Sequence, residues 1–160
     1  MPPVIPAAKL SPTSPKITTI PPVIYSQPFE SPPSIAVVEG CDSNGCEYMT
    51  GGNVIILGGT GDNFAAGMTG GMAFIYDKSH QFTKKVNPES VVWQTVETDY
   101  WKEILKNLIS EHSKETGSEF SRNIIKNYDE ELINFVQVCP KEMLDKLDNP
   151  ITLKDIKKVS

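Results

Sequence analysis

The sequence predicts a mainly β fold: a parallel β-helix of about three coils with one strand per repeat, followed by C-terminal α-helices. Ten of the 13 prolines lie in residues 1–33, ten of the 11 glycines lie between Gly40 and Gly71, and the glycine-rich part carries a 19-residue repeat. These three observations divide the 160 residues into a disordered proline-rich segment (1–33), a β-helix (34–80), and a linker with a helical C-terminal layer (81–160).

The proline-rich segment is predicted to form neither helices nor central strands. Each proline removes a backbone hydrogen-bond donor and fixes φ, which favours polyproline II conformation or disorder. Two PxxP matches, Pro3–Pro6 and Pro12–Pro15, would suit an SH3-like domain. Because such matches arise by chance in any proline-rich sequence, we interpret the segment as a disordered tail.

The repeat aligns residues 46–57 with residues 65–76, so that two Met-Thr-Gly-Gly runs coincide. Short apolar strands are therefore predicted to start near residues 35, 54 and 73. The structural corners of the repeat are assigned to Gly51, Gly52, Gly70 and Gly71, and the inward-facing ladder to Val37, Ile56 and Ile75. A meander of three hairpin-linked strands is the rival interpretation. The recurring Met-Thr-Gly-Gly run favours the β-helix, because it implies the same geometry in each repeat.

The C-terminal part, residues 81–160, is predicted to be helical. A broad apolar stripe at helical spacing consists of Tyr100, Trp101, Ile104, Leu105, Leu108, Ile109 and His112. Gly117 and Ser118 supply a stop and a new N-cap, after which a second helix carries Ile124 and could continue to Val136. Pro140 opens a short third helix. The side of the β-helix, or a partner, would cover the apolar stripes of these helices.

Composition and charge exclude several classes of function. The net charge of -5 argues against a basic surface for nucleic acid or anionic membranes. No apolar run approaches the ~20 residues that a membrane-spanning helix needs, and no signal peptide is visible. Three cysteines do not make a disulfide framework. We therefore expect a cytoplasmic protein that binds neither nucleic acid nor membrane.

Two features suggest a cofactor or phosphate site, and neither meets the chemical requirements. Four residues separate Cys41 from Cys46, and Cys139 is remote in the sequence. A zinc or iron–sulfur site needs three or four convergent ligands. The run 58–63, Gly-Gly-Thr-Gly-Asp-Asn, lacks the Lys-Ser/Thr of a P-loop and the helix of a dinucleotide loop. We therefore expect the cysteines to be small buried side chains or exposed thiols at a corner, and residues 58–63 to form a corner of the β-helix.

No catalytic, cofactor-binding or metal-binding residue is predicted. His80 and His112 form no recognisable Ser/His/Asp arrangement, and His112 is expected to offset a helix dipole. A carboxylate pair among Glu39, Asp42 and Glu47 is the alternative to a solvated acidic corner, which we favour. Trp93 and Trp101 are expected to be packing anchors between the β-helix and the helices.

Two stretches resemble the C-terminal GXGXG domain of the glutamate synthase large subunit. They are residues 38–58, which contain Gly-Cys-Glu-Tyr-Met-Thr-Gly-Gly, and residues 63–77, which contain the second Gly-Met-Thr-Gly-Gly. Val86-Asn-Pro-Glu89 and the helix that ends before Gly117 continue the match, which covers about residues 34–147. The resemblance implies a right-handed β-helix that acts as a structural spacer in glutamate biosynthesis from glutamine and 2-oxoglutarate.

The resemblance also implies which parts of the enzyme this chain lacks. The family's glutaminase uses an N-terminal cysteine, but Pro2 follows Met1 here. FMN and the iron–sulfur cluster belong to a (β/α)8 domain for which no sequence is present. Pro32-Pro33 stands where an earlier Gly-Gly corner is expected, which indicates a split, truncated or decayed gene. We therefore expect no catalysis by this chain alone.

Three functional hypotheses follow. The first is a scaffold subunit that completes a glutamate synthase whose catalytic domains or subunits are separately encoded. The second is a gene remnant with no present activity. The third, an independent enzyme, has the least support in the sequence.

Overall fold

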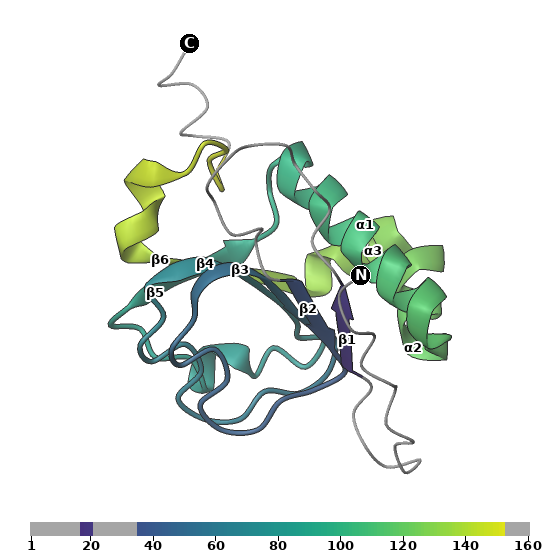
Figure 1. Ribbon diagram of the computed structural model, residues 1–160, viewed down its shortest axis with the longest axis horizontal. Helices are drawn as coiled ribbons and strands as arrows, with labels where there is room; N and C mark the ends of the chain where they lie inside the picture. The colour runs from purple at the N-terminus through teal and green to yellow at the C-terminus, as the bar shows by residue number, and fades with distance from the viewer. Residues whose placement is uncertain (1–16, 21–34, 153–160) are drawn as a thin grey trace, which may run out of the picture.

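The computed structural model describes residues 17–20 and 35–152, and one mixed β-sheet lies at its centre (Figure 1). Strands β2 (Ile35–Val38), β3 (Thr50–Ile56) and β4 (Gly70–Tyr76) run parallel to one another. The remaining strands are antiparallel to their neighbours: β1 (Ile17–Ile20) pairs with β2, β6 (Phe135–Pro140) pairs with β4, and β5 (Val91–Thr95) pairs with β6. The order across the sheet is β1-β2-β3-β4-β6-β5.

The predicted β-helix is wrong, because the strands form one open mixed sheet without β-helix coils. The strand that follows β4 in the sheet is β6, which comes about sixty residues later in the sequence and runs antiparallel to it. The repeat does produce parallel neighbours, with Val54 beside Ala73 and Ile55 beside Phe74, after a register shift between Thr50 and Asn53. This parallel pairing also excludes the hairpin-linked meander. The sequence repeat determines how the repeated strands pair with one another. It does not determine which segment pairs with the outer edge of the last repeated strand, β4.

The N-terminal segment contributes one strand to this sheet. β1 lies at the edge of the sheet, which is where a strand from a proline-rich sequence is tolerated. The PxxP matches and the rest of the predicted disordered segment, residues 1–16 and 21–33, lie outside the described residues. Within the residues that the structure describes, no helix is long and apolar enough to cross a membrane.

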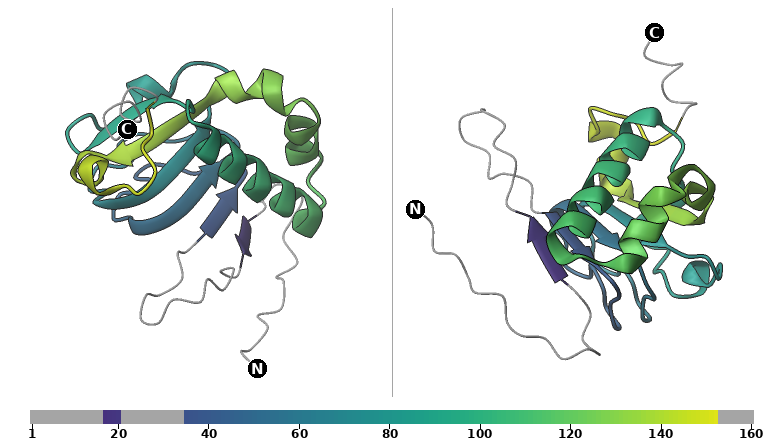
Figure 2. Two further views of the ribbon diagram at one scale, coloured as in Figure 1. Left: turned by 90° about the horizontal axis from the view of Figure 1, so that it is seen from above. Right: turned by 90° about the vertical axis from the view of Figure 1, so that its right-hand side faces the viewer.

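Three helices cover one face of the sheet: α1 (Asp99–Thr116), α2 (Glu119–Lys126) and α3 (Tyr128–Glu131) (Figure 2). The predicted stop and N-cap between the first two are confirmed. Gly117 ends α1 with φ 64°, and the Ser118 hydroxyl accepts a hydrogen bond from the Ser121 N–H at 3.2 Å. Helix formation ends earlier than predicted, because Val136 lies in β6. Pro140 is followed by a 3₁₀ helix, η3 (Lys141–Lys146), and two further 3₁₀ turns are η1 (Phe82–Lys84) and η2 (Leu132–Asn134).

Both faces of the sheet are apolar, and each is covered differently. The face toward the helices buries Trp101, Leu105 and Ile109 against strand residues such as Phe74. The opposite face packs on the loops that connect the parallel strands, where Phe64 and Met68 lie among the buried residues. Burying both faces of the parallel strands explains their continuous apolar runs. Trp101 is an anchor between sheet and helices, as predicted, whereas Trp93 packs toward the loop side.

The connecting loops stack on one another through their backbones. The Cys41 N–H donates to the Gly59 carbonyl at 3.0 Å, and the Ala65 N–H donates to the Gly45 carbonyl at 2.8 Å. Equivalent positions also share unusual backbone angles. Residues with positive φ recur 19 positions apart in three pairs, which are Asn44 and Asn63, Cys46 and Ala65, and Gly52 and Gly71. The repeat therefore governs the loops as well as the strands.

The predicted corner glycines lie at the beginnings of β3 and β4, and they meet different surroundings. A side chain at Gly70 would overlap the Thr50 carbonyl oxygen of the preceding strand, whereas a side chain at Gly51 would meet nothing within 4 Å. Gly52 and Gly71 have φ of 84° and 85°, which disfavours any L residue. Two glycines that are equivalent in the sequence repeat thus differ in what they tolerate.

Gly70→Ala should lower the free energy of unfolding by about 2–3 kcal/mol, because the added methyl group forces two backbones apart. Gly51→Ala is the matched control, which should change it by no more than about 0.5 kcal/mol. Urea unfolding followed by circular dichroism measures both. Equal effects of the two substitutions would contradict the backbone contact between β3 and β4.

Candidate functional site

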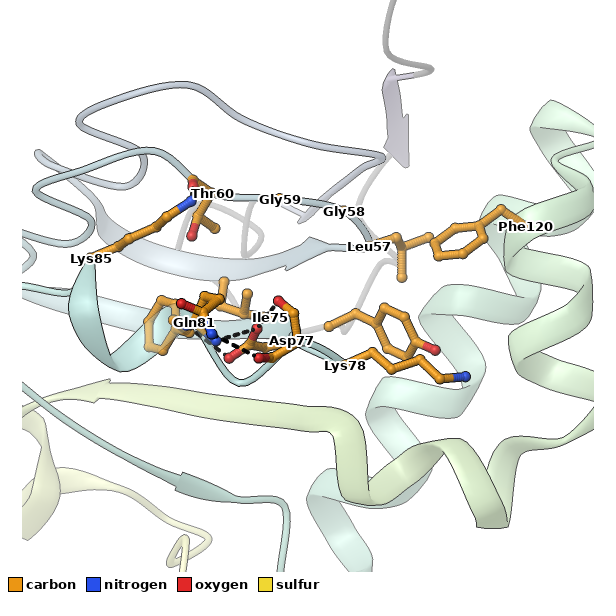
Figure 3. A pocket seen from close by; sticks show the side chains of 13 residues that line it. Leu57, Gly58, Gly59, Thr60, Ile75, Asp77, Lys78, Gln81, Lys85 and Phe120 are labelled. Carbon is orange, nitrogen blue, oxygen red and sulfur yellow. Dashed lines mark hydrogen bonds between the residues drawn. The ribbon is translucent and has the colours of Figure 1, made fainter.

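A cleft of about 270 Å³ opens at the carboxyl ends of the parallel strands β3 and β4 (Figure 3). The loop that follows β3 and the loop that follows β4 form its two walls. Its lining residues are Leu57, Gly58, Gly59, Thr60, Ile75, Tyr76, Asp77, Lys78, Ser79, Gln81, Phe82, Lys85 and Phe120. Ligands of open α/β sheets commonly bind at the carboxyl ends of the strands, so this cleft is the candidate ligand site.

The charged groups of one part of the cleft are engaged in holding its loops. Both carboxylate oxygens of Asp77 accept backbone N–H groups, from Gln81 at 3.0 Å and from Phe82 at 2.8 Å. The Lys85 ammonium group donates to the Thr60 carbonyl at 2.5 Å, which joins the two walls. Figure 3 shows Asp77 and Gln81 turned toward each other and Lys85 beside Thr60. Asp77 therefore holds the turn that follows β4, and Lys85 ties the two walls of the cleft together.

The other end of the cleft is apolar and leads to a polar network on the helical side. Leu57 and Phe120 lie toward each other there, and the Tyr76 and Phe120 rings meet edge to face at 5.7 Å. The Tyr76 hydroxyl donates to Glu131 at 2.6 Å, and Glu131 also accepts from Lys78 at 3.2 Å and from Asn134 at 2.7 Å. One carboxylate therefore ties β4 to α3 and η2.

This network shifts the titration of its two acidic groups in opposite directions. The hydrogen bond from Tyr76, with those from Lys78 and Asn134, lowers the pKa of Glu131. Burial, together with the hydrogen bond to Glu131, raises the pKa of Tyr76. Both groups are held in the protonation states they already have at neutral pH, which suits a structural role better than proton transfer.

A second polar cluster joins the sheet to the helices. The Ser118 hydroxyl donates to Glu39, and His112 Nε2 lies 3.9 Å from the same carboxylate oxygen of Glu39. His112 is completely buried, and it lies in the last turns of α1 as predicted. The hydroxyl and the imidazole both face the carboxylate. In a catalytic triad the imidazole instead stands between the other two groups, so this cluster is not one.

The cysteines do not converge. Cys139 is buried in the core between sheet and helices, whereas Cys41 and Cys46 pack on the opposite, loop side of the sheet. Burial raises the pKa of all three thiols, to about 12 for Cys46 and about 11 for Cys139. Reactive thiols have lowered pKa values, so the arrangement agrees with the prediction of structural cysteines. Within residues 17–20 and 35–152, no group of three metal-binding side chains is found.

The remaining predicted candidates are also placed apart. Glu39 is bound to Ser118, while Asp42 accepts the N–H of Ser43 at the surface. His80 has a positive φ of 54° in the exposed turn after β4. The glycine-rich run 58–63 continues into the loop stack, where a side chain at Gly58 would overlap the Glu39 carbonyl group. The carboxylate pair and the phosphate loop are therefore not formed.

The cluster around Glu131 was missed in the sequence analysis. Its members are separated by more than fifty positions, because Tyr76 and Lys78 follow β4 while Glu131 precedes β6. No spacing within either segment signals that contact. Only the antiparallel pairing of β4 with β6, which sets Tyr76 opposite Phe135, brings the segments together.

Glu131→Gln should destabilise the fold by about 1–2 kcal/mol at pH 7, since a hydrogen-bonded carboxylate loses its charge. The folded-state pKa of Glu131 is lowered, so its contribution is present above the unfolded-state value and is lost as the pH falls through the folded-state value. The variant should therefore lose less stability than the wild type in acid. Urea unfolding between pH 7 and pH 3 tests this, with the exposed Glu130→Gln as the control. Parallel curves for wild type and Glu131→Gln would refute the assignment.

Comparison with known proteins identifies the family. A family model described as "GXGXG motif" matches residues 31–141. The chain is 53% identical over 117 residues to the glutamate synthase [NADPH] large chain of Azospirillum brasilense, which covers 73% of this chain and 8% of that protein. It is 43% identical over 122 residues to the glutamate synthase [NADH] of Schizosaccharomyces pombe, with 76% and 6% covered. It is 49% identical over 105 residues to the chloroplastic ferredoxin-dependent glutamate synthase of Spinacia oleracea, with 66% and 6% covered.

The chain therefore spans less than a tenth of the length of these relatives, while the match takes up most of the chain itself. The resemblance noted in the sequence is confirmed by the family match and by all three relatives. The chain belongs to the GXGXG motif family and is homologous to the GXGXG domain of glutamate synthase large chains.

Proposed function

We propose that the chain is a non-catalytic structural domain that holds together the parts of a glutamate synthase in the cytoplasm. Its partners would be the catalytic domains or subunits of that enzyme, encoded separately from this chain. The observation that carries the proposal is the use of the cleft's charged groups. Lys85 joins the two walls of the cleft, Asp77 holds the turn after β4, and beside the cleft Glu131 joins α3 to β4.

The range of relatives supports a role common to all of them. The three relatives are named for three different reductants, NADPH, NADH and ferredoxin, yet each contains a segment that is 43–53% identical to this chain. A segment that contacted the reductant would be expected to differ with it. A scaffold that positions the parts common to all these enzymes needs no such difference.

The cofactors implied by the family do not fit the residues present here. An iron–sulfur cluster needs convergent thiolates, but the three cysteines lie on opposite faces of the sheet. Lys78 and Lys85, the lysines that line the cleft, are bonded to Glu131 and to the Thr60 carbonyl, which argues against a site for the phosphate of FMN. We therefore propose that FMN and the iron–sulfur cluster are held by other domains of the enzyme.

Deleting the coding segment for this chain in its source cells should abolish assembly of glutamate synthase. The complex should sediment as smaller species, and glutamine-dependent formation of glutamate in extracts should fall at least tenfold. Restoring the segment with Gly51→Ala should rescue both readouts, whereas Gly70→Ala should not, because only the second change disturbs the stacked backbones.

Unchanged sedimentation and activity after the deletion would contradict the scaffold. That outcome would favour the alternative stated from the sequence, a gene remnant with no present activity. Formation of glutamate by the purified chain alone would contradict both hypotheses.

A further inference from the structure

We propose that the free edge of β5 binds an extended strand of the glutamate synthase polypeptide from outside the matched segment. This inference rests on the proposed scaffold function and names the surface that performs it. β1 and β5 are the two edge strands of the sheet, and among the described residues each pairs with one neighbour, β1 with β2 and β5 with β6. Figure 1 shows β5 as the last strand of the sheet.

The register of β5 and β6 shows which backbone groups face outward. The Lys141 N–H donates to the Ser90 carbonyl at 3.0 Å, and Val91 lies opposite Pro140 in a pair without mutual hydrogen bonds. Because hydrogen-bonded and non-bonded pairs alternate, Val92 and Gln94 direct their N–H and C=O groups to β6. Val91, Trp93 and Thr95 direct theirs away from the sheet.

The accessible part of this edge runs from Trp93 to Thr95. Val91 is buried, Trp93 is half-buried and Thr95 is exposed. The strand has no charged residue, no proline and no register irregularity, which are three of the devices that protect an edge from pairing. An unprotected edge of this kind is a template for strand addition.

A shallow hollow beside the edge indicates the chemistry of the incoming strand. Its volume is about 310 Å³, and Pro88, Val91, Val92 and Trp93 line it. These side chains are apolar, so the added strand should present β-branched or other apolar side chains toward the hollow. Its main chain would supply the hydrogen bonds that Trp93 and Thr95 lack from β6.

A second copy of this chain is the other occupant that a strand edge invites. Antiparallel pairing of two β5 strands over their whole length would centre on Trp93 and set Val91 opposite Thr95 of the other copy. Beyond the strand ends this arrangement would bring Glu89 of each copy toward Glu97 of the other, and like charges brought together disfavour a strand pair. The proposed occupant is instead a strand from the rest of the glutamate synthase polypeptide. More than nine-tenths of each relative lies outside the matched segment, and β5 lies within that segment.

Proline and alanine at position 95 form a matched pair of test variants. Thr95→Pro removes one outward N–H, which proline at a sheet edge can do without breaking the ladder to β6. Thr95→Ala keeps that N–H. Tagged wild-type chain and both variants are expressed in source cells, and the recovered glutamate synthase polypeptide is quantified by mass spectrometry. We expect equal recovery with wild type and Thr95→Ala, and at least tenfold less with Thr95→Pro.

Amide hydrogen exchange gives a second readout that does not depend on the proline variant folding. In the free chain the amides of Trp93 and Thr95 should exchange quickly, and in the purified complex both should become at least tenfold slower. The Val92 amide, which is bound to β6 in either state, serves as the internal reference.

The outcomes separate this inference from the proposed function. Equal recovery with Thr95→Pro and Thr95→Ala, or unchanged exchange at Trp93 in the complex, overturns the β5 assignment and leaves the scaffold intact. No recovery of glutamate synthase even with the wild-type chain overturns both. A dimer of this chain alone, lost in Thr95→Pro, would assign the edge to a second copy and also overturn the proposal.

Discussion

The close backbone contact between successive repeats is the constraint on which the rest of the structure depends. Thr50 and Gly70 touch at the start of β3 and β4, and Glu39 and Gly58 touch where the following loops begin. Only glycine allows such approach, so these positions set the strand spacing and the loop stacking together. The parallel register, the apolar core under the loops, and the cleft at the strand ends follow from this stacking.

The sheet that results has two apolar faces, and the helices are needed to cover the second. Polar clusters at the margins fix how they are attached. Glu39 receives Ser118 at the junction of α1 and α2, and Glu131 receives Tyr76 where α3 leads into β6. In both clusters an acidic side chain joins a sheet strand to the helical layer. This use of ionisable groups as attachments is the physical basis for interpreting the domain as a scaffold.

The parts of the fold that have local sequence patterns could be predicted, whereas those that depend on contacts between remote segments could not. The repeat predicts three parallel strands, and the stripe around Leu105 together with Gly117 predicts α1 and its end, because these patterns are local. β6 was missed because Phe135–Pro140 follows a helical pattern and acquires its strand partner only from β4. The β-helix prediction was wrong for the same reason, because the repeat does not show that the remote segment β6 pairs with β4. Of the candidate sites, the place of His112 in the last turns of α1 and the separation of Cys139 from the other two cysteines could be predicted from the sequence, whereas the Glu131 cluster depends on a contact between remote segments.

The central claim is that this chain is a component of an assembled glutamate synthase. Native mass spectrometry of the endogenous chain, isolated gently from its source cells, tests it most directly. The scaffold account predicts a complex of defined mass in which this chain and a flavin-containing glutamate synthase polypeptide occur in a whole-number ratio. Isolation of this chain without any such polypeptide would contradict it.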